Sequence, residues 1–211
     1  MTTHETSFFR DRNPFEFMEE TFFPNLLKEP PARKRLGIWS AACSSGQEIY
    51  SISMIIHQLF PDLLKWDLDF HATDISEPVL NKARKGSYSQ LEVNRGLPMS
   101  YLIRYFSQGE DNSWNIKEKI KDSVEFSAVN LIEPWPNWAP FQVIFMRNVL
   151  IYFDVPTKKK ILNKIKAYLH TGGILFLGAA ESTLNLDPDW EVIREGKSTM
   201  YRLKDLKKPH A

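Results

Sequence analysis

Short apolar runs alternate with longer amphipathic runs along most of the chain, and this pattern predicts the fold. Apolar runs at residues 38–41, 68–73, 124–129, 143–146 and 174–178 predict strands, and amphipathic runs at residues 47–60, 77–85 and 155–169 predict helices. Such alternation favours a mostly parallel sheet with right-handed crossovers. Two further runs, residues 190–194 and 199–203, predict terminal strands that could pair as an antiparallel hairpin.

The first 35 residues form a predicted helical lead-in to the sheet. The sequence Asn13-Pro14-Phe15-Glu16 is typical of a helix start, with Asn13 as the N-cap, Pro14 at the first helical position and Glu16 completing a capping box. The helix is expected to run to residue 28, because Pro30 and Pro31 follow it.

The alternation pauses between residues 86 and 123. This span contains a predicted helix at residues 98–106, a polar turn at residues 108–112 and short strands around residues 114–116. It predicts a small inserted antiparallel β-subdomain, residues 86–123, within one domain spanning residues 1–211. A chain of 211 residues is long enough for one α/β domain with a sizeable core.

Composition excludes several classes of protein. The net charge of +1 provides no basic field for nucleic acid, and Arg33-Lys34-Arg35 is interpreted as a solvated loop face. One cysteine excludes an internal disulfide, and the five histidines lack metal-ligand spacing. The sequence shows no signal peptide and no apolar run long enough to cross a bilayer. We therefore expect a cytoplasmic protein that uses no metal, binds no nucleic acid and does not insert into a membrane.

Polar residues follow the strand at residues 142–146. This strand ends on Arg147 and Asn148, in an otherwise apolar run. In an open α/β sheet, ligands bind outside the carboxyl ends of the strands. A ligand therefore explains these residues better than packing does. The alternative is a capped strand end, with Arg147 paired to a carboxylate.

Two other strand ends suggest a nucleoside ligand. Asp74 closes its strand, at a position where an acidic residue commonly binds ribose hydroxyls. Alternatively, Asp74 or Ser76 caps the helix that follows. Asn130 could contact an adenine edge with Leu131 packed on the ring, or it could be an ordinary turn residue.

The loop from residue 41 to residue 46 contains only small side chains. Small residues let a ligand approach the backbone, and Gly46 adds freedom in φ. The N–H groups of the following helix would favour an anionic ligand group. The loop lacks the three glycines of a dinucleotide fingerprint, and a plain strand-to-helix turn explains it about as well.

Five segments, spread over nearly the whole chain, form a combined pattern. They are THETSFFR at residues 3–10, WSAACSSGQE at 39–48, ATDIS at 72–76, FSAVNL at 126–131 and FMRNVLIYF at 145–153. Together they resemble the CheR family, the chemotaxis receptor glutamate methyltransferases that use S-adenosylmethionine. The first and last segments are specific to that family, although His4 stands where the family commonly has Asn. The resemblance implies a class I methyltransferase fold, which is α/β, Rossmann-like and doubly wound.

The resemblance also implies a role for each site residue. Arg10 and Tyr152 would orient the acceptor carboxylate, although a surface ion pair for Arg10 and a core position for Tyr152 are the alternatives. The implied cofactor contacts are Thr6, Glu48, Arg147 and Asn148 at the methionine end, Asp74 at the ribose, and Asn130 with Leu131 at the adenine. Arg10 and Gly46 are also included among the cofactor-binding residues. A glutamate is already ionised at neutral pH, so it can attack the sulfonium methyl without a general base, leaving S-adenosylhomocysteine.

The implied partner is the cytoplasmic stalk of methyl-accepting chemotaxis receptors, and we expect this protein to act as a monomer. Family members usually carry a leading all-helical domain, so this chain is either a catalytic-domain piece or a naturally short version. Tail-docking members present a glycine-rich loop in the insert. Here the turn has only Gly109, followed by Glu110 and Asp111, so we expect no strong binding of a receptor tail. The competing functions are methylation of another acceptor and non-catalytic cofactor binding.

Overall fold

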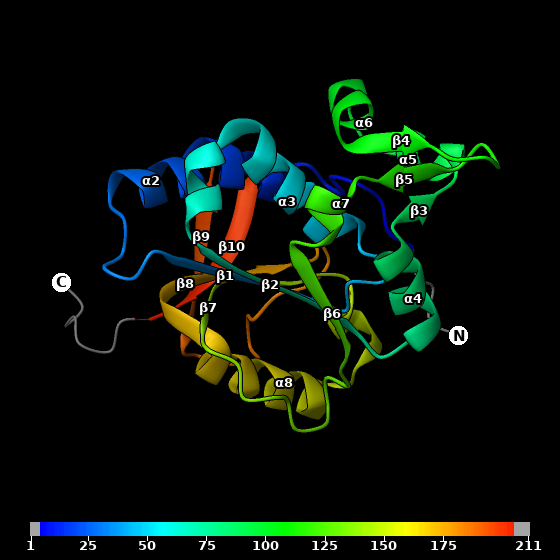
Figure 1. The fold of residues 1–211 in the computed structure, drawn as a ribbon. Coiled ribbons are helices and arrows are strands. Elements are labelled where there is room, and N and C mark those ends of the chain that lie inside the picture. The colour runs from blue at the N-terminus through cyan, green and yellow to red at the C-terminus, as the bar shows by residue number, and fades with distance from the viewer. Residues whose placement is uncertain (1–4, 205–211) are drawn as a thin grey trace.

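A seven-stranded sheet forms the middle layer of this computed structural model, which describes residues 5–204 (Figure 1). The strand order is β6-β2-β1-β7-β8-β10-β9. The strands are β1 (Arg35–Ala41), β2 (Asp67–Asp74), β6 (Val124–Ala128), β7 (Phe141–Met146), β8 (Leu169–Leu177), β9 (Trp190–Glu195) and β10 (Ser198–Leu203). His4 lies outside the described residues.

The sheet is mostly parallel and doubly wound. β1 pairs in parallel with β2 and with β7, and the pairs β2–β6 and β7–β8 are also parallel. β10 is antiparallel to both β8 and β9, which confirms the predicted terminal hairpin. The strand order reverses between β1 and β7, and the crevice at such a point is where open α/β sheets bind ligands. The predicted class I methyltransferase fold is confirmed.

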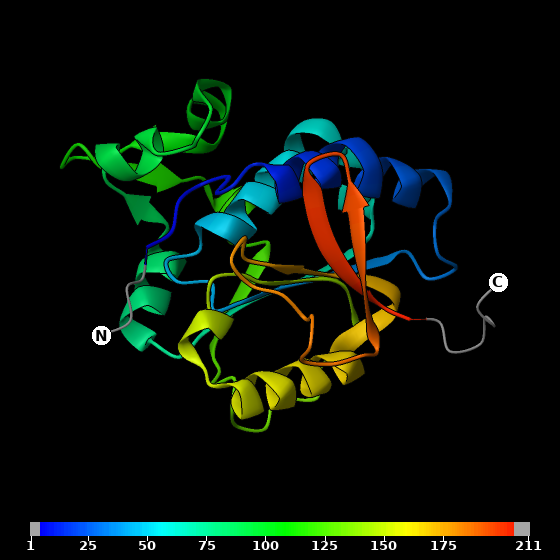
Figure 2. The same cartoon turned by 180° about the vertical axis from the view of Figure 1, so that it is seen from behind.

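Helices cover both faces of the sheet (Figures 1 and 2). One face carries α1 (Asn13–Phe17), a π-helical turn (Met18–Phe22), α2 (Phe23–Lys28) and α3 (Gln47–Leu59), while α8 (Val155–Tyr168) covers the other. The chain also contains a 3-10 turn (Pro61–Lys65) and α4 (Glu77–Lys85). Successive strand residues point to opposite faces, so Ile38 and Phe145 lie in one core and Trp39 and Ile144 in the other.

The predicted antiparallel insert is present as a three-stranded sheet in the order β3-β5-β4. Its elements are β3 (Ser87–Tyr88), α5 (Gln90–Asn94), α6 (Met99–Tyr105), β4 (Phe106–Gln108), β5 (Trp114–Ile116) and α7 (Glu118–Lys121). Figure 1 shows it projecting from one side of the main sheet. Arg95 of the insert pairs with Glu5, so the insert contacts the segment that precedes α1.

The start of the first helix differs from the prediction. The helical stretch does cover Asn13 to Lys28, but Asn13 is its first residue and no side chain caps it; the N-cap is Arg12. The Asn13 amide instead donates to the Lys197 carbonyl at 3.1 Å, and the Ser198 hydroxyl donates to the Asn13 carbonyl at 2.6 Å. A tertiary contact with the β9–β10 hairpin has replaced the local capping box.

Two smaller predictions are also wrong. Arg35 does not belong to a solvated loop face: it begins β1, pairs with Asp69 and donates to the Pro140 carbonyl at 2.8 Å. β8 begins at Leu169 rather than at residue 174, because Leu169 already pairs with Phe141 of β7; Gly172 and Gly173 lie in the irregular stretch before the pairing resumes at Ile174. Among residues 5–204, none of the helices combines the length and apolar character that a membrane span requires.

Candidate active site

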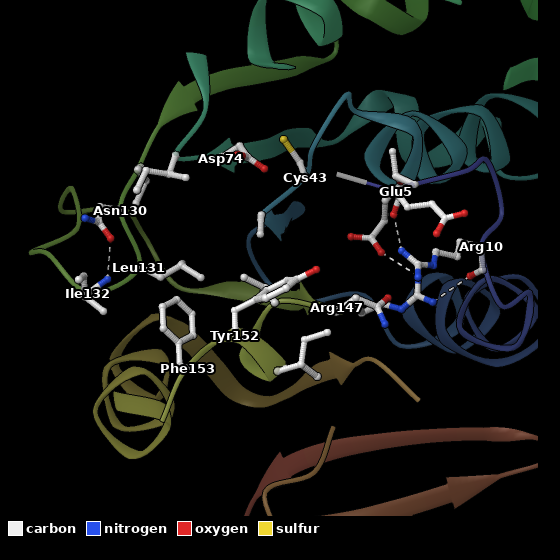
Figure 3. Close-up of a pocket in the computed structure, with 18 residues that line it drawn as sticks. Glu5, Arg10, Cys43, Asp74, Asn130, Leu131, Ile132, Arg147, Tyr152 and Phe153 are labelled. Carbon is white, nitrogen blue, oxygen red and sulfur yellow. Dashed lines mark hydrogen bonds and ion pairs between the residues drawn. The ribbon is translucent and has the colours of Figure 1, made fainter. Parts of the chain in front are cut away.

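A pocket of about 500 Å³ opens beside the carboxyl ends of β1, β2, β6 and β7, and its size suits a small-molecule ligand. The lining residues, shown in Figure 3, are Glu5, Thr6, Arg10, Ala42, Cys43, Glu48, Asp74, Ile75, Val129, Asn130, Leu131, Ile132, Arg147, Asn148, Val149, Ile151, Tyr152 and Phe153. This set contains each of the site residues predicted from the sequence except Gly46.

Asp74, the last residue of β2, is 5% exposed and held by two backbone groups. The Ser44 N–H donates to its Oδ2 and the Ser76 N–H to its Oδ1, each at 2.9 Å. The carboxylate therefore also orders the turn into α4. The alternative, that Asp74 or Ser76 caps this helix, is wrong, because the N-cap is Ser76 and no side chain among residues 5–204 bonds to the first helical N–H groups. Each carboxylate oxygen has a second lone pair, so Asp74 can still accept hydrogen bonds from a ligand.

Gly46 shapes the pocket without lining it. It precedes α3 with φ of +88°, a left-handed conformation that favours glycine. A Cβ at this position would lie 3.1 Å from the Cβ of Ala83 and 3.2 Å from the Tyr50 ring. The tight turn leaves Ala42 and Cys43 on the pocket wall. Burial raises the pKa of the Cys43 thiol well above its usual range, so the thiol stays neutral at physiological pH.

The predicted adenine end of the pocket is a short loop after β6, which side-chain hydrogen bonds hold in place. The Asn130 side-chain oxygen accepts a hydrogen bond from the Ile132 N–H at 3.1 Å, so this residue does form a turn. That bond uses one of the two lone pairs of the oxygen, so the second lone pair and the amide nitrogen are left for a ligand. Lys164 of α8 donates to the carbonyls of Leu131 and Glu133, at 2.6 and 2.7 Å.

Arg147 lies at the opposite end of the pocket, where its buried guanidinium bonds to groups from two other segments; 4% of its side chain is exposed. Its Nη1 donates to Glu48 Oε2 at 2.8 Å, and its Nη2 donates to Asp11 Oδ2 at 2.5 Å and to the Arg10 carbonyl at 2.9 Å. Ser40 donates to the other oxygen of Glu48. The alternative interpretation of Arg147 as half of an ion pair is therefore also correct, but the paired carboxylate of Glu48 itself lines the pocket.

The segment before α1 forms one wall and carries Glu5, Thr6 and Arg10. Arg10 Nη1 donates to the Glu5 carbonyl at 2.6 Å, so the two residues fold toward each other (Figure 3). No carboxylate within residues 5–204 forms an ion pair with Arg10. The guanidinium therefore has N–H groups left for a ligand, and the alternative interpretation, a surface ion pair, is not seen among residues 5–204.

Tyr152 occupies the centre of the pocket in Figure 3, with its side chain directed into the cavity. It ends the 3-10 helix Leu150–Tyr152 and is 47% exposed. A core aromatic would be nearly inaccessible to solvent, so the alternative interpretation of Tyr152 is wrong. Its hydroxyl is available to a group that enters from outside.

Sequence reasoning missed several lining residues. Ile75, Ile132 and Phe153 directly follow predicted site residues, so the strand-end rule could have included them. Cys43 lies within the small-residue loop that was already singled out. Glu5 had no local signal, because its place on the wall depends on the contacts of the whole N-terminal segment with Arg95 and Arg10.

Comparison with known proteins gives a consistent result. The family model described as CheR methyltransferase, SAM binding domain, matches residues 4–200. Chemotaxis protein methyltransferase 1 of Pseudomonas aeruginosa is 42% identical over 207 residues, covering 97% of this chain and 75% of that protein. Its namesake from Vibrio cholerae is 41% identical over 208 residues, covering 97% of this chain and 74% of that protein.

A solved structure of a glycopeptide N-methyltransferase complexed with S-adenosyl-L-methionine aligns with a TM-score of 0.42 and 12% identity, over 74% of this chain and 48% of that one. The family match extends over nearly all the residues that form the sheet and the pocket. The chain belongs to the CheR methyltransferase family and is an S-adenosylmethionine-dependent methyltransferase.

Proposed function

We propose that this chain transfers the methyl group of S-adenosylmethionine to glutamate side chains in the cytoplasmic stalks of chemoreceptors, forming glutamate methyl esters. The observation that carries the proposal is the meeting of Arg10 and Tyr152 at one pocket, from segments far apart in a chain of the CheR family. The names of the relatives, chemotaxis protein methyltransferases, support receptors as the acceptors. The same acceptor class implies action in the cytoplasm, and we propose that the 1–211 domain acts as a monomer.

The pocket residues fit the proposed cofactor. Asp74 can accept hydrogen bonds from ribose hydroxyls, because two backbone N–H groups hold it in place and its oxygens keep free lone pairs. Asn130 and Leu131 would hold the adenine, and Thr6 would lie beside the methionine part. Glu48, Arg147 and Asn148 would also line that end, where the Glu48 carboxylate suits a cationic group. When bound, S-adenosylmethionine supplies an electrophilic methyl group on a sulfonium.

The protein's task toward the acceptor is orientation rather than proton transfer. A glutamate carboxylate is charged at neutral pH, so it is already a nucleophile. Holding it in line with the bond that breaks removes much of the entropic barrier. Arg10 can donate to one carboxylate oxygen through the N–H groups that its bond to Glu5 leaves free. The Tyr152 hydroxyl can donate to the same carboxylate from the other side of the pocket.

The nature of the bond formed tests this proposal. Receptor-containing membranes are incubated with the protein and methyl-labelled S-adenosylmethionine, and the labelled protein is then treated with mild alkali. An ester should release its label as volatile methanol, and the Arg10→Ala variant should incorporate far less label. Label that survives alkali would show methylation of nitrogen or carbon and would overturn the proposal.

A further inference from the structure

The turn that carries Asn148 and Tyr152 has a backbone that needs external support. Asn148 follows β7 with φ of +58°, in the left-handed region, which asparagine adopts more readily than most residues but less readily than glycine. The turn then continues through Val149 into the short 3-10 helix that ends at Tyr152. Tyr152 itself is half-exposed, so packing around its ring provides little of that support.

Glu181 provides the support from the loop after β8. Its carboxylate, in a residue that is 8% exposed, accepts three backbone hydrogen bonds. Oε2 accepts from the Asn148 N–H at 2.8 Å and from the Gly178 N–H at 2.6 Å, and Oε1 accepts from the Ile151 N–H at 3.2 Å. Charge-assisted hydrogen bonds of this kind are stronger than neutral ones. One buried carboxylate thus joins the active-site turn to the end of β8.

Gly178 lets the Glu181 carboxylate and the Asn148 backbone come close together. A Cβ at Gly178 would lie 2.7 Å from Glu181 Oε2 and 2.8 Å from the Asn148 backbone nitrogen, distances that real Cβ atoms do not tolerate. On the other side, the Tyr201 hydroxyl of β10 donates to the Glu181 carbonyl at 3.3 Å. The carboxylate is therefore positioned by the sheet itself and does not line the pocket.

We propose that Glu181 is a positioning residue for methyl transfer: it holds the 148–152 turn so that Tyr152 faces the acceptor. The proposal rests on the function proposed above, because it assumes that Tyr152 orients the acceptor carboxylate. Glu181 acts through the turn and touches neither substrate.

The test is a double-mutant cycle between Glu181 and Tyr152. Glu181→Gln keeps the size of the side chain, but it removes the charge and replaces one acceptor oxygen with an NH2 group, which cannot accept. Losing one of the charge-assisted bonds to the turn should lower turnover by about tenfold. Cofactor affinity, measured by calorimetry, should fall much less than turnover, since Asn148 is the one proposed cofactor contact on this turn and the Asp74 end is untouched. In the Tyr152→Phe background the same substitution should have little further effect.

A second measurement does not depend on the acceptor. Amide hydrogen exchange of Asn148 and Ile151 should accelerate in Glu181→Gln, because their N–H groups donate to this carboxylate. Glu191→Gln is the matched control: Glu191 lies on β9, pairs with Arg202 and is partly exposed, so neither turnover nor exchange in the turn should change. If Glu181→Gln does not fold, Glu181→Asp, which keeps the charge on a shorter side chain, replaces it.

Three outcomes would overturn the role of Glu181. They are a loss of turnover that is equally large in the Tyr152→Phe background, a fall in cofactor affinity that matches the fall in turnover, and unchanged exchange at Asn148 and Ile151. A wild-type protein that forms no alkali-labile ester defeats the proposed function instead, and the exchange measurement then still decides whether Glu181 holds the turn.

Discussion

The two ends of the pocket are held together in different ways. At the end assigned to the nucleoside, Asp74 and Asn130 follow directly from β2 and β6, and backbone groups of nearby turns hold their side chains. At the end assigned to the acceptor, Arg10 and Tyr152 lie on irregular segments that are far apart in sequence. Side chains at a distance, above all Arg147, tie those segments to the sheet.

This difference has a functional consequence. The nucleoside end is formed as soon as the parallel strands pair, because their carboxyl ends meet at one edge of the sheet. The acceptor end depends on a few charged hydrogen bonds across long sequence separations. Substitutions at the nucleoside end should therefore change cofactor affinity, and substitutions at the acceptor end should change turnover.

The largest effect is expected from Arg147→Met, since Arg147 joins Glu48, Asp11 and the Arg10 carbonyl at the acceptor end. Removing the guanidinium leaves Glu48 nearly buried without a cation and frees the Arg10 carbonyl. The free energy of unfolding should fall by about 3 kcal/mol, measured by denaturant titration, as for other broken buried ion pairs. Arg202→Met, which breaks the partly exposed pair with Glu191, is the control and should cost less than about 1 kcal/mol. Equal losses of unfolding free energy in the two variants would show that the bonds of Arg147 stabilise the fold no more than a partly exposed ion pair does.

Arg10→Ala should lower turnover about a hundredfold, because a misplaced acceptor loses most of the benefit of orientation. Cofactor affinity should remain within about threefold of the wild-type value. Arg10→Lys keeps the charge but loses the planar donor geometry, so its turnover should lie between that of the wild type and that of Arg10→Ala. Turnover and cofactor affinity falling in parallel would place Arg10 at the cofactor end and erase the contrast between the two ends.

Asp74→Ala should show the reverse pattern. Losing a charge-assisted hydrogen-bond site should weaken the binding of S-adenosylhomocysteine by about tenfold to a hundredfold. Turnover at saturating cofactor should change much less. Calorimetric titration of the wild type and the variant measures the first quantity, and Asp62→Ala, at a distant exposed ion pair with Lys65, is the control. Equal affinities in the wild type and Asp74→Ala would remove Asp74 from the cofactor site.

The smallest effect is expected at the outer turn of the insert. The insert itself contacts the acceptor wall through the Arg95–Glu5 pair and through the Phe8 ring, which packs on Tyr88 and Phe106. β4 is an edge strand, but the turn after Gln108 carries Glu110 and Asp111, which disfavour the addition of a further strand. Peptides from the tails of receptors should therefore show no binding in the low micromolar range, about −8 kcal/mol. Replacing both acidic residues with serine should strengthen binding if charge is the obstacle. Micromolar binding by the wild type would make the insert a docking module.

The pattern of apolar and polar positions determined the order of the elements, the parallel sheet with its antiparallel hairpin, and the strand ends where Asp74, Asn130 and Arg147 stand. These features follow from side-chain periodicity and from where each apolar run stops, which are local properties of the chain. The Arg10 and Tyr152 assignments came from a combined family pattern, since neither residue has a local signal of its own.

Tertiary structure alone decided which polar groups meet. Asn13 forms a predicted capping box by sequence, yet it bonds to the β9–β10 turn, and Arg35 becomes part of β1 with Asp69 as its partner. The bonds of Glu181 to the Asn148 turn, and those of Arg147 to Asp11 and Glu48, join segments that no local pattern relates. A buried polar group must find a partner, but the partner's identity depends on how the sheet brings distant segments together, because hydrogen bonds are satisfied in space rather than along the chain.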